Sequence, residues 1–90
     1  MKNKETNAEG DAALALAALG WTLADGERAQ RLLALTGLTP DDLRENLDRP
    51  AFLADTLRFL EAHEPDLLAC AEALEVRPSR LVDARQRLEQ

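Results

Sequence analysis

The alternation of apolar and polar positions along the chain is typical of a series of short helices. In residues 50–62, PAFLADTLRFLEA, the apolar side chains form one helical stripe: Phe52, Leu53, Leu57 and Leu60. The charged residues of this segment face the other way, as they do in a surface helix. Applied along the whole chain, the same pattern predicts six helices, at about 11–24, 27–36, 40–47, 50–62, 65–74 and 78–88.

Capping residues set the expected helix boundaries. Pro40, Pro65 and Pro78 suit the first turn of a helix, where the missing N–H costs nothing. Thr39 before Pro40 supplies a hydroxyl cap, and Gly37 can take the left-handed conformation that ends the preceding helix. Pro50 opens another helix. Short connections of this kind are usual between packed helices.

The six helices resemble three helices used twice. A shift of 38 positions superimposes turn, aromatic and core residues, laying Pro78 on Pro40, Leu81 on Leu43, Leu57 on Leu19, Phe59 on Trp21 and Val76 on Leu38. We therefore predict two similar three-helix units, residues 11–48 and 49–90. The alternative is that six unrelated helices share similar capping residues and first-turn prolines because all helices need such boundaries.

The first predicted helix differs from its counterpart in lacking a polar face. Where residues 50–62 have Asp55 and Arg58, the first helix has Ala17 and Gly20. Its small residues and a leucine form a column that another helix could approach closely, and they are the candidate interaction residues: Ala13, Ala17, Gly20, Leu23 and Ala24. A helix apolar on nearly all sides must be covered, either by the last helix or tail of this chain or by a second molecule.

Composition agrees with an all-α fold and limits the partners. Leucine and alanine dominate the apolar residues, whereas isoleucine and tyrosine are absent, so strand-forming residues are scarce. The formal net charge of -6 disfavours nucleic acid and anionic lipid as partners. The most apolar stretch, residues 12–24, is too short to span a membrane, and the polar leader does not resemble a signal peptide. We expect residues 1–10 to form a disordered arm, residues 11–90 one domain, and the location to be cytoplasmic.

No residue pattern points to catalysis. His63 lies near a helix end without an acid–base partner, and Cys70 shares a helical side with Leu67 and Leu74, which favours a core position. Trp21 and Phe59 are expected to be core anchors at matching positions of the repeat. No metal-ligand spacing, phosphate loop or nucleophile–base pair occurs in the sequence, so we predict no enzymatic activity, no cofactor and no metal.

The last two helices also have the spacing of a DNA-binding helix-turn-helix. Residues 77–90 carry four arginines against two acids, and the candidate DNA contacts are Arg77, Ser79, Arg80 and Arg85. The alternative is that these arginines complement the dipole of their helix and pair with the acidic remainder of the domain. We favour a protein partner, which includes a second copy of the chain forming a homodimer, and keep DNA binding as the alternative function.

The motif LLALTGLTPDDLR, followed by PAFLADTLRFL and a closing helix, resembles a small alphaproteobacterial family, domain of unknown function number 3572. The resemblance covers nearly everything after the N-terminal arm. It implies a bacterial cytoplasmic domain and no particular activity. Two positions depart from the family pattern: Gly26 stands where a proline commonly opens the second helix, and Glu75 where a glycine commonly ends the fifth. A positive φ at Glu75 would strain the fold by roughly 1 kcal/mol.

Overall fold

The computed structural model describes residues 8–90, which form six helices and no strands. The helices are α1 (Ala8–Leu23), α2 (Gly26–Thr36), α3 (Pro40–Asn46), α4 (Pro50–Glu61), α5 (Glu64–Leu74) and α6 (Pro78–Leu88). The predicted all-α class and the order of the helices are confirmed, and most boundaries lie within a residue of the expected ones. None of these helices is both long and apolar enough to cross a membrane.

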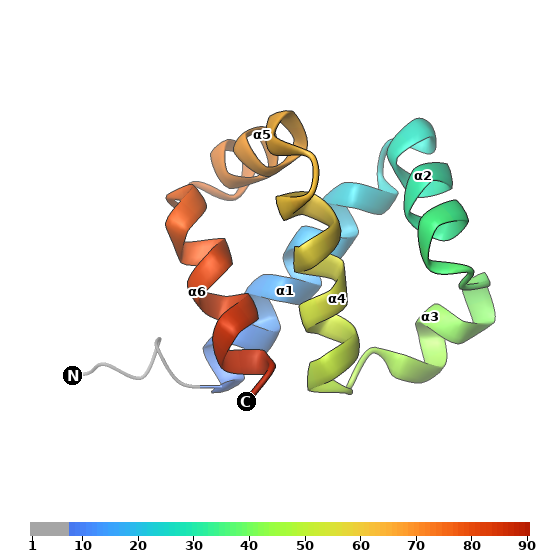
Figure 1. The fold of residues 1–90 in the computed structure, drawn as a ribbon, viewed down its shortest axis with the longest axis horizontal. Helices are drawn as coiled ribbons and strands as arrows, with labels where there is room; N and C mark the ends of the chain where they lie inside the picture. The colour runs from blue at the N-terminus through green and yellow to red at the C-terminus, as the bar shows by residue number, and fades with distance from the viewer. Residues whose placement is uncertain (1–7) are drawn as a thin grey trace.

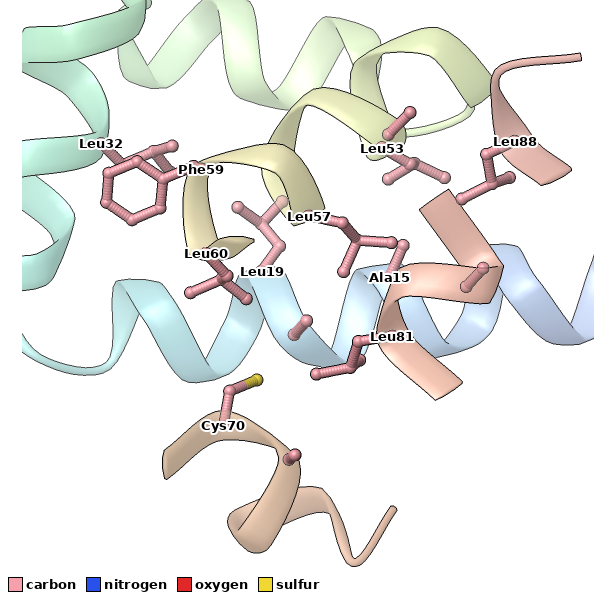
Figure 2. Close-up of a cluster of buried hydrophobic side chains, with 14 residues drawn as sticks. Ala15, Leu19, Leu32, Leu53, Leu57, Phe59, Leu60, Cys70, Leu81 and Leu88 are labelled. Atoms are coloured by element: carbon pink, nitrogen blue, oxygen red, sulfur yellow. The ribbon is translucent and has the colours of Figure 1, made fainter. Parts of the chain in front are cut away.

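Three helices form the centre of the domain. α1, α4 and α6 pack closely against one another, α5 lies across one end of them, and α2 packs on α1 (Figure 1). Their shared core consists mainly of leucine and alanine, with Leu57 and Ala15 side by side at its middle and Phe59 reaching toward Leu32 of α2 (Figure 2). α3 stands apart at the edge and makes only sparse contacts with the other described helices.

Helix α1 begins earlier than predicted. Residues 8–10, which we expected to belong to a disordered arm, form its first turn, because Asp11 just behind them is buried and ion-paired to α6. This anchorage fixes the start of the helix. The remaining residues of the predicted arm, 1–7, lie outside the described part of the chain.

Side-chain hydrogen bonds cap the starts of two helices, α2 and α3. The Thr39 hydroxyl accepts a hydrogen bond from the Asp42 N–H (3.1 Å), while the Asp42 carboxylate accepts one from the Thr39 N–H (3.0 Å). This reciprocal capping box starts α3. The Asp25 carboxylate caps α2 by accepting a hydrogen bond from the Arg28 N–H (3.0 Å). The sharp turns between helices therefore follow from local sequence.

Two helices end in the left-handed conformation, at positions that correspond in the repeat. Gly37 (φ 73°) ends α2 without strain, because glycine has no Cβ. Glu75 (φ 61°, ψ 42°) ends α5, and the Val76 N–H that follows it donates to the Ala71 carbonyl at 3.0 Å. The positive φ anticipated at Glu75 is confirmed.

Replacing Glu75 by glycine is expected to raise the free energy of unfolding by about 1 kcal/mol, because glycine adopts this conformation without steric cost. The same exchange at Glu72, an exposed position inside α5, serves as the matched control and should lower stability by about 1 kcal/mol. Urea denaturation followed by circular dichroism measures both. A loss of stability in Glu75→Gly would contradict the assigned strain.

Several helix boundaries have the 38-residue offset of the predicted repeat, whereas the starts of α1 and α4 do not. Gly26–Thr36 and Glu64–Leu74 are offset by 38 positions at both ends, and so are the starts of α3 and α6. The packing is not repeated, however. α6 has 11 residues and packs on both α1 and α4, whereas α3 has 7 residues and leaves α1 largely uncovered.

Candidate functional site

The side of α1 that faces the core is formed by small and polar residues. Asp11, Ala15, Ala18 and Thr22 are buried, and the Thr22 hydroxyl donates to the Ala18 carbonyl at 2.9 Å within the helix. The small side chains of Ala15 and Ala18 let α4 and α6 approach the helix axis closely. The two polar residues of this segment, Asp11 and Thr22, therefore face inward together with Ala15, Ala18 and Leu19, while other small residues of α1 remain on its outer side.

The opposite side of α1 is apolar and exposed. The five candidate interaction residues, Ala13, Ala17, Gly20, Leu23 and Ala24, all lie in solvent contact, and Leu16 is exposed beside them. The expectation that the last helix or tail of the chain covers this column is wrong, because α6 packs on the side that carries Asp11. A Cβ added at Gly20 would meet no atom within 4 Å.

A groove runs along this exposed face between α1 and α3. It encloses about 410 Å³ and is lined by Leu16, Leu19, Gly20, Leu23, Pro40, Leu43, Arg44 and Leu47. Leu16 is 40% exposed, and Leu23 and Leu47 are each 37% exposed. Arg44 is the one charged side chain in the lining, and it pairs with Asp41 on its own helix. The groove is thus an apolar hollow with charge at its α3 rim.

The two predicted units differ at the positions that border the groove. In the second unit the corresponding helices, α4 and α6, are held together by Arg85, whose Nε and Nη2 donate to the two Glu61 oxygens at 2.8 and 2.9 Å. The counterparts of Glu61 and Arg85 in the first unit are Leu23 and Leu47. Those two leucines line the groove without closing it.

Asp11 is the most buried charged residue of the described chain, with a relative exposure of 0%. Arg87 donates to it from Nε (2.7 Å) and Nη2 (3.0 Å), and Arg80 donates from Nη1 (2.9 Å). Burial acts to raise the pKa of Asp11, but the hydrogen bonds from Arg87 and Arg80 outweigh it and hold the pKa below its ordinary value. The cluster clamps the start of α1 to α6.

The candidate DNA-contact arginines lie mostly in intramolecular ion pairs. Arg80 is bound to Asp11, and Arg85 is bound to Glu61 and Glu89. The alternative interpretation, that these arginines pair with the acidic remainder of the domain, is therefore confirmed for both. Arg77 and Ser79 are exposed. Phosphate binding by Arg80 or Arg85 would have to replace a carboxylate already in place.

The remaining candidates occupy structural positions. Cys70 is buried against the core, where burial raises the pKa of its thiol to about 11 and makes it a poor nucleophile (Figure 2). His63 lies exposed at the start of α5. Phe59 is buried in the core, while Trp21 packs against it half-buried under the Arg28 guanidinium, 3.6 Å from the ring centroid. Within residues 8–90 no three His, Cys, Asp or Glu residues gather closely enough to hold a metal ion.

The sequence pointed to the small-residue column on α1, which was expected to be covered, but not to two features around it. The second wall of the groove, which Pro40, Leu43 and Leu47 provide, was not predicted. The role of Asp11 was not predicted either, although an acid at the start of an apolar helix and an arginine-rich last helix are a visible charge complement. The apolar spacing of Pro40, Leu43 and Leu47 was the available signal for the second wall.

The described residues thus define a small all-α domain whose distinctive surface is an apolar helix face with an adjoining groove. The chain belongs to the protein family of unknown function DUF3572, which matches residues 8–90. The match confirms the family, whereas an alphaproteobacterial origin stays a prediction. No curated protein and no solved structure matches the chain.

Proposed function

We propose that this domain is a non-catalytic protein-interaction module that binds its partner through the exposed face of α1. The observation that carries the proposal is the composition of that face. Residues 12–24 contain no charged side chain, and the six outward residues are Ala13, Leu16, Ala17, Gly20, Leu23 and Ala24. A contiguous exposed apolar patch on a small domain commonly marks a site of protein association.

The small outward residues suit close helix–helix contact. Ala13, Ala17, Gly20 and Ala24 present little more than backbone, so a partner helix can approach α1 along its whole length. The larger side chains Leu16 and Leu23 flank this column and offer the apolar area to be buried. The partner is a protein, either a second copy of this chain or another polypeptide, and the proposed setting is the bacterial cytoplasm.

Site-specific crosslinking tests this proposal. A photoreactive benzoylphenylalanine in place of Ala17 should give a defined crosslinked adduct in the native host, whereas the same group in place of exposed Leu68 of α5 should give none. Sedimentation of the purified chain shows whether the adduct is a dimer of the chain. Equal adducts from both positions, or none from position 17, would contradict the proposal.

The second unit supplies matched variants for the same test. Ala17→Asp and Gly20→Arg import the charged counterparts Asp55 and Arg58 onto the face of α1. Both positions are exposed, and a Cβ at Gly20 meets nothing, so the fold should remain intact. Gly20→Arg is combined with the photoreactive group at position 17, and Ala17→Asp with the same group in place of exposed Ala13. Circular dichroism checks the fold, and loss of the adduct in a folded variant supports the role of this face. An undiminished adduct would place the contact elsewhere.

A further inference from the structure

The groove between α1 and α3 has two unlike walls. The α1 wall is uncharged from residue 12 to residue 24 and provides Leu16, Leu19, Gly20 and Leu23. The α3 wall provides three apolar side chains, but residues 39–48 around them carry four acids against one arginine. The one charged side chain in the lining, Arg44, is already paired with Asp41, whereas Glu45 and Asp48 are exposed beside the groove. An occupant that is apolar toward α1 and positively charged where it passes Glu45 and Asp48 therefore complements both walls.

We infer that the groove receives a basic amphipathic helix of another protein. This inference rests on the proposed function and specifies the partner's chemistry. Leucine-like side chains spaced as on one face of a helix would enter the groove. Lysine or arginine side chains beside them would meet Glu45 and Asp48, which are exposed next to it.

The size of the exposed face favours a single helix over a second copy of the domain. The exposed apolar residues run from Ala13 to Ala24, which gives a strip roughly 18 Å long and about 10 Å wide, or roughly 180 Å². A stable interface between two folded proteins buries about 800 Å² on each side. The net charge of -6 on each molecule also opposes self-association. A peptide-sized helix matches the strip and carries the opposite charge.

The domain itself contains an example of the proposed occupant. α6 is the counterpart of α3, carries an apolar stripe of Leu81, Ala84 and Leu88, and has arginines beside it. It packs against α1 and α4 and pairs its arginines with Asp11 and Glu61. The occupant would cover the open side of α1 with apolar side chains, which the shorter α3 does not do.

Designed peptides test the inference on the full chain. Two fluorescent helical peptides of about 14 residues share leucines at i, i+3 or i+4, and i+7, and differ only in carrying lysine or glutamate at the flanking positions. Fluorescence anisotropy should show that the lysine peptide binds at least about tenfold more tightly than the glutamate peptide. Its binding should weaken when salt rises from about 0.05 M to about 0.5 M.

A matched pair of variants locates the contact. Leu23→Glu places in the groove the residue type found at the corresponding position 61 and should weaken the lysine peptide at least about tenfold, because a charge is buried under apolar side chains. Leu68→Glu makes the same change on an exposed leucine of α5 and should have no effect. Gly20→Arg, whose Cβ meets nothing, repeats the test should Leu23→Glu be unfolded by circular dichroism.

Several results would overturn the inference. Equal or tighter binding of the glutamate peptide, or no binding of either peptide, rules out a basic helix as the occupant. Binding that survives Leu23→Glu and Gly20→Arg places it outside the groove. Dimers of the purified chain that Leu23→Glu dissociates would identify a second copy as the occupant. In each case a crosslinked adduct at position 17 would still support the proposed interaction function. Absence of that adduct would contradict both the proposed function and this inference.

Discussion

Replacing Asp11 by alanine is expected to lower the free energy of unfolding by about 2–3 kcal/mol at neutral pH. The carboxylate is fully buried and accepts three hydrogen bonds from Arg80 and Arg87, so its removal unties the start of α1 from α6. Both arginines keep contact with solvent, which limits the cost of leaving them without this partner. Urea denaturation of the two proteins at pH 7 measures the difference.

The Asp11 carboxylate makes the free energy of unfolding depend on pH, and the direction of its pKa shift gives the sign of this dependence. The pKa of Asp11 is lower in the folded chain than its ordinary value of 3.8, so its contribution is fully present above that value and is lost as the pH falls through the folded pKa. The pKa of Glu89 is also lowered, because hydrogen bonds from Arg85 and Arg58 outweigh its desolvation. The difference between the wild type and Asp11→Asn, followed from pH 7 to about pH 3, isolates the part due to Asp11.

An exposed acid provides the control for Asp11. Asp55→Ala on the outer side of α4 should change stability by less than about 0.5 kcal/mol. A similarly small effect of Asp11→Ala would show that the clamp between α1 and α6 contributes little, and an unchanged difference between wild type and Asp11→Asn at every pH would contradict the assigned pKa shift.

Helix boundaries could be predicted from the sequence because local chemistry sets them. Thr39 and Asp42 cap α3 through groups three residues apart, and Gly37 ends α2 through its own backbone freedom. Neither depends on how the helices pack. The left-handed conformation of Glu75 could be predicted in the same way, because the predicted repeat aligns Glu75 with Gly37. Local rules therefore sufficed for the number and order of the helices and for their ends, except the start of α1, where Asp11 is paired with α6.

The orientation of α1 could not be predicted, because its apolar residues are spread around the helix. A stripe normally shows which side faces the core, and α4 has one in Leu53, Leu57 and Leu60. In α1 the choice depends on contacts far away in sequence, the ion pairs of Asp11 with Arg80 and Arg87. Of the two alternatives for the column, covering by the last helix or tail of the chain is therefore wrong, and covering by a second molecule stays a prediction.

The groove likewise depends on tertiary structure. Leu43 and Leu47 have ordinary helical spacing, and nothing in the sequence shows that α3 stands away from α1. The length of α3 is the physical reason, since 7 residues cannot provide the area that the 11 residues of α6 bury against α1 and α4. The positions that match across the predicted repeat therefore do not imply equivalent packing.

Truncating the two equivalent core leucines is expected to have unequal effects. Leu57 is enclosed between α1, α4 and α6, so Leu57→Ala leaves a closed cavity and should cost about 3–4 kcal/mol (Figure 2). Leu19, its counterpart, is nearly as buried but lines the groove. The space left by Leu19→Ala is continuous with solvent, which reduces the cavity contribution, and the expected cost is about 2 kcal/mol.

Urea denaturation of both variants under the same conditions gives the comparison, with Leu68→Ala at an exposed position as the control that should change little. The difference between Leu57→Ala and Leu19→Ala reports whether the groove is open in solution, because both substitutions remove the same atoms from the same core. Equal costs would mean that Leu19 is enclosed as fully as Leu57, which requires α3 to close on α1 or a second molecule to occupy the groove. A larger cost for Leu57→Ala would leave the face of α1 accessible to the partner that we propose.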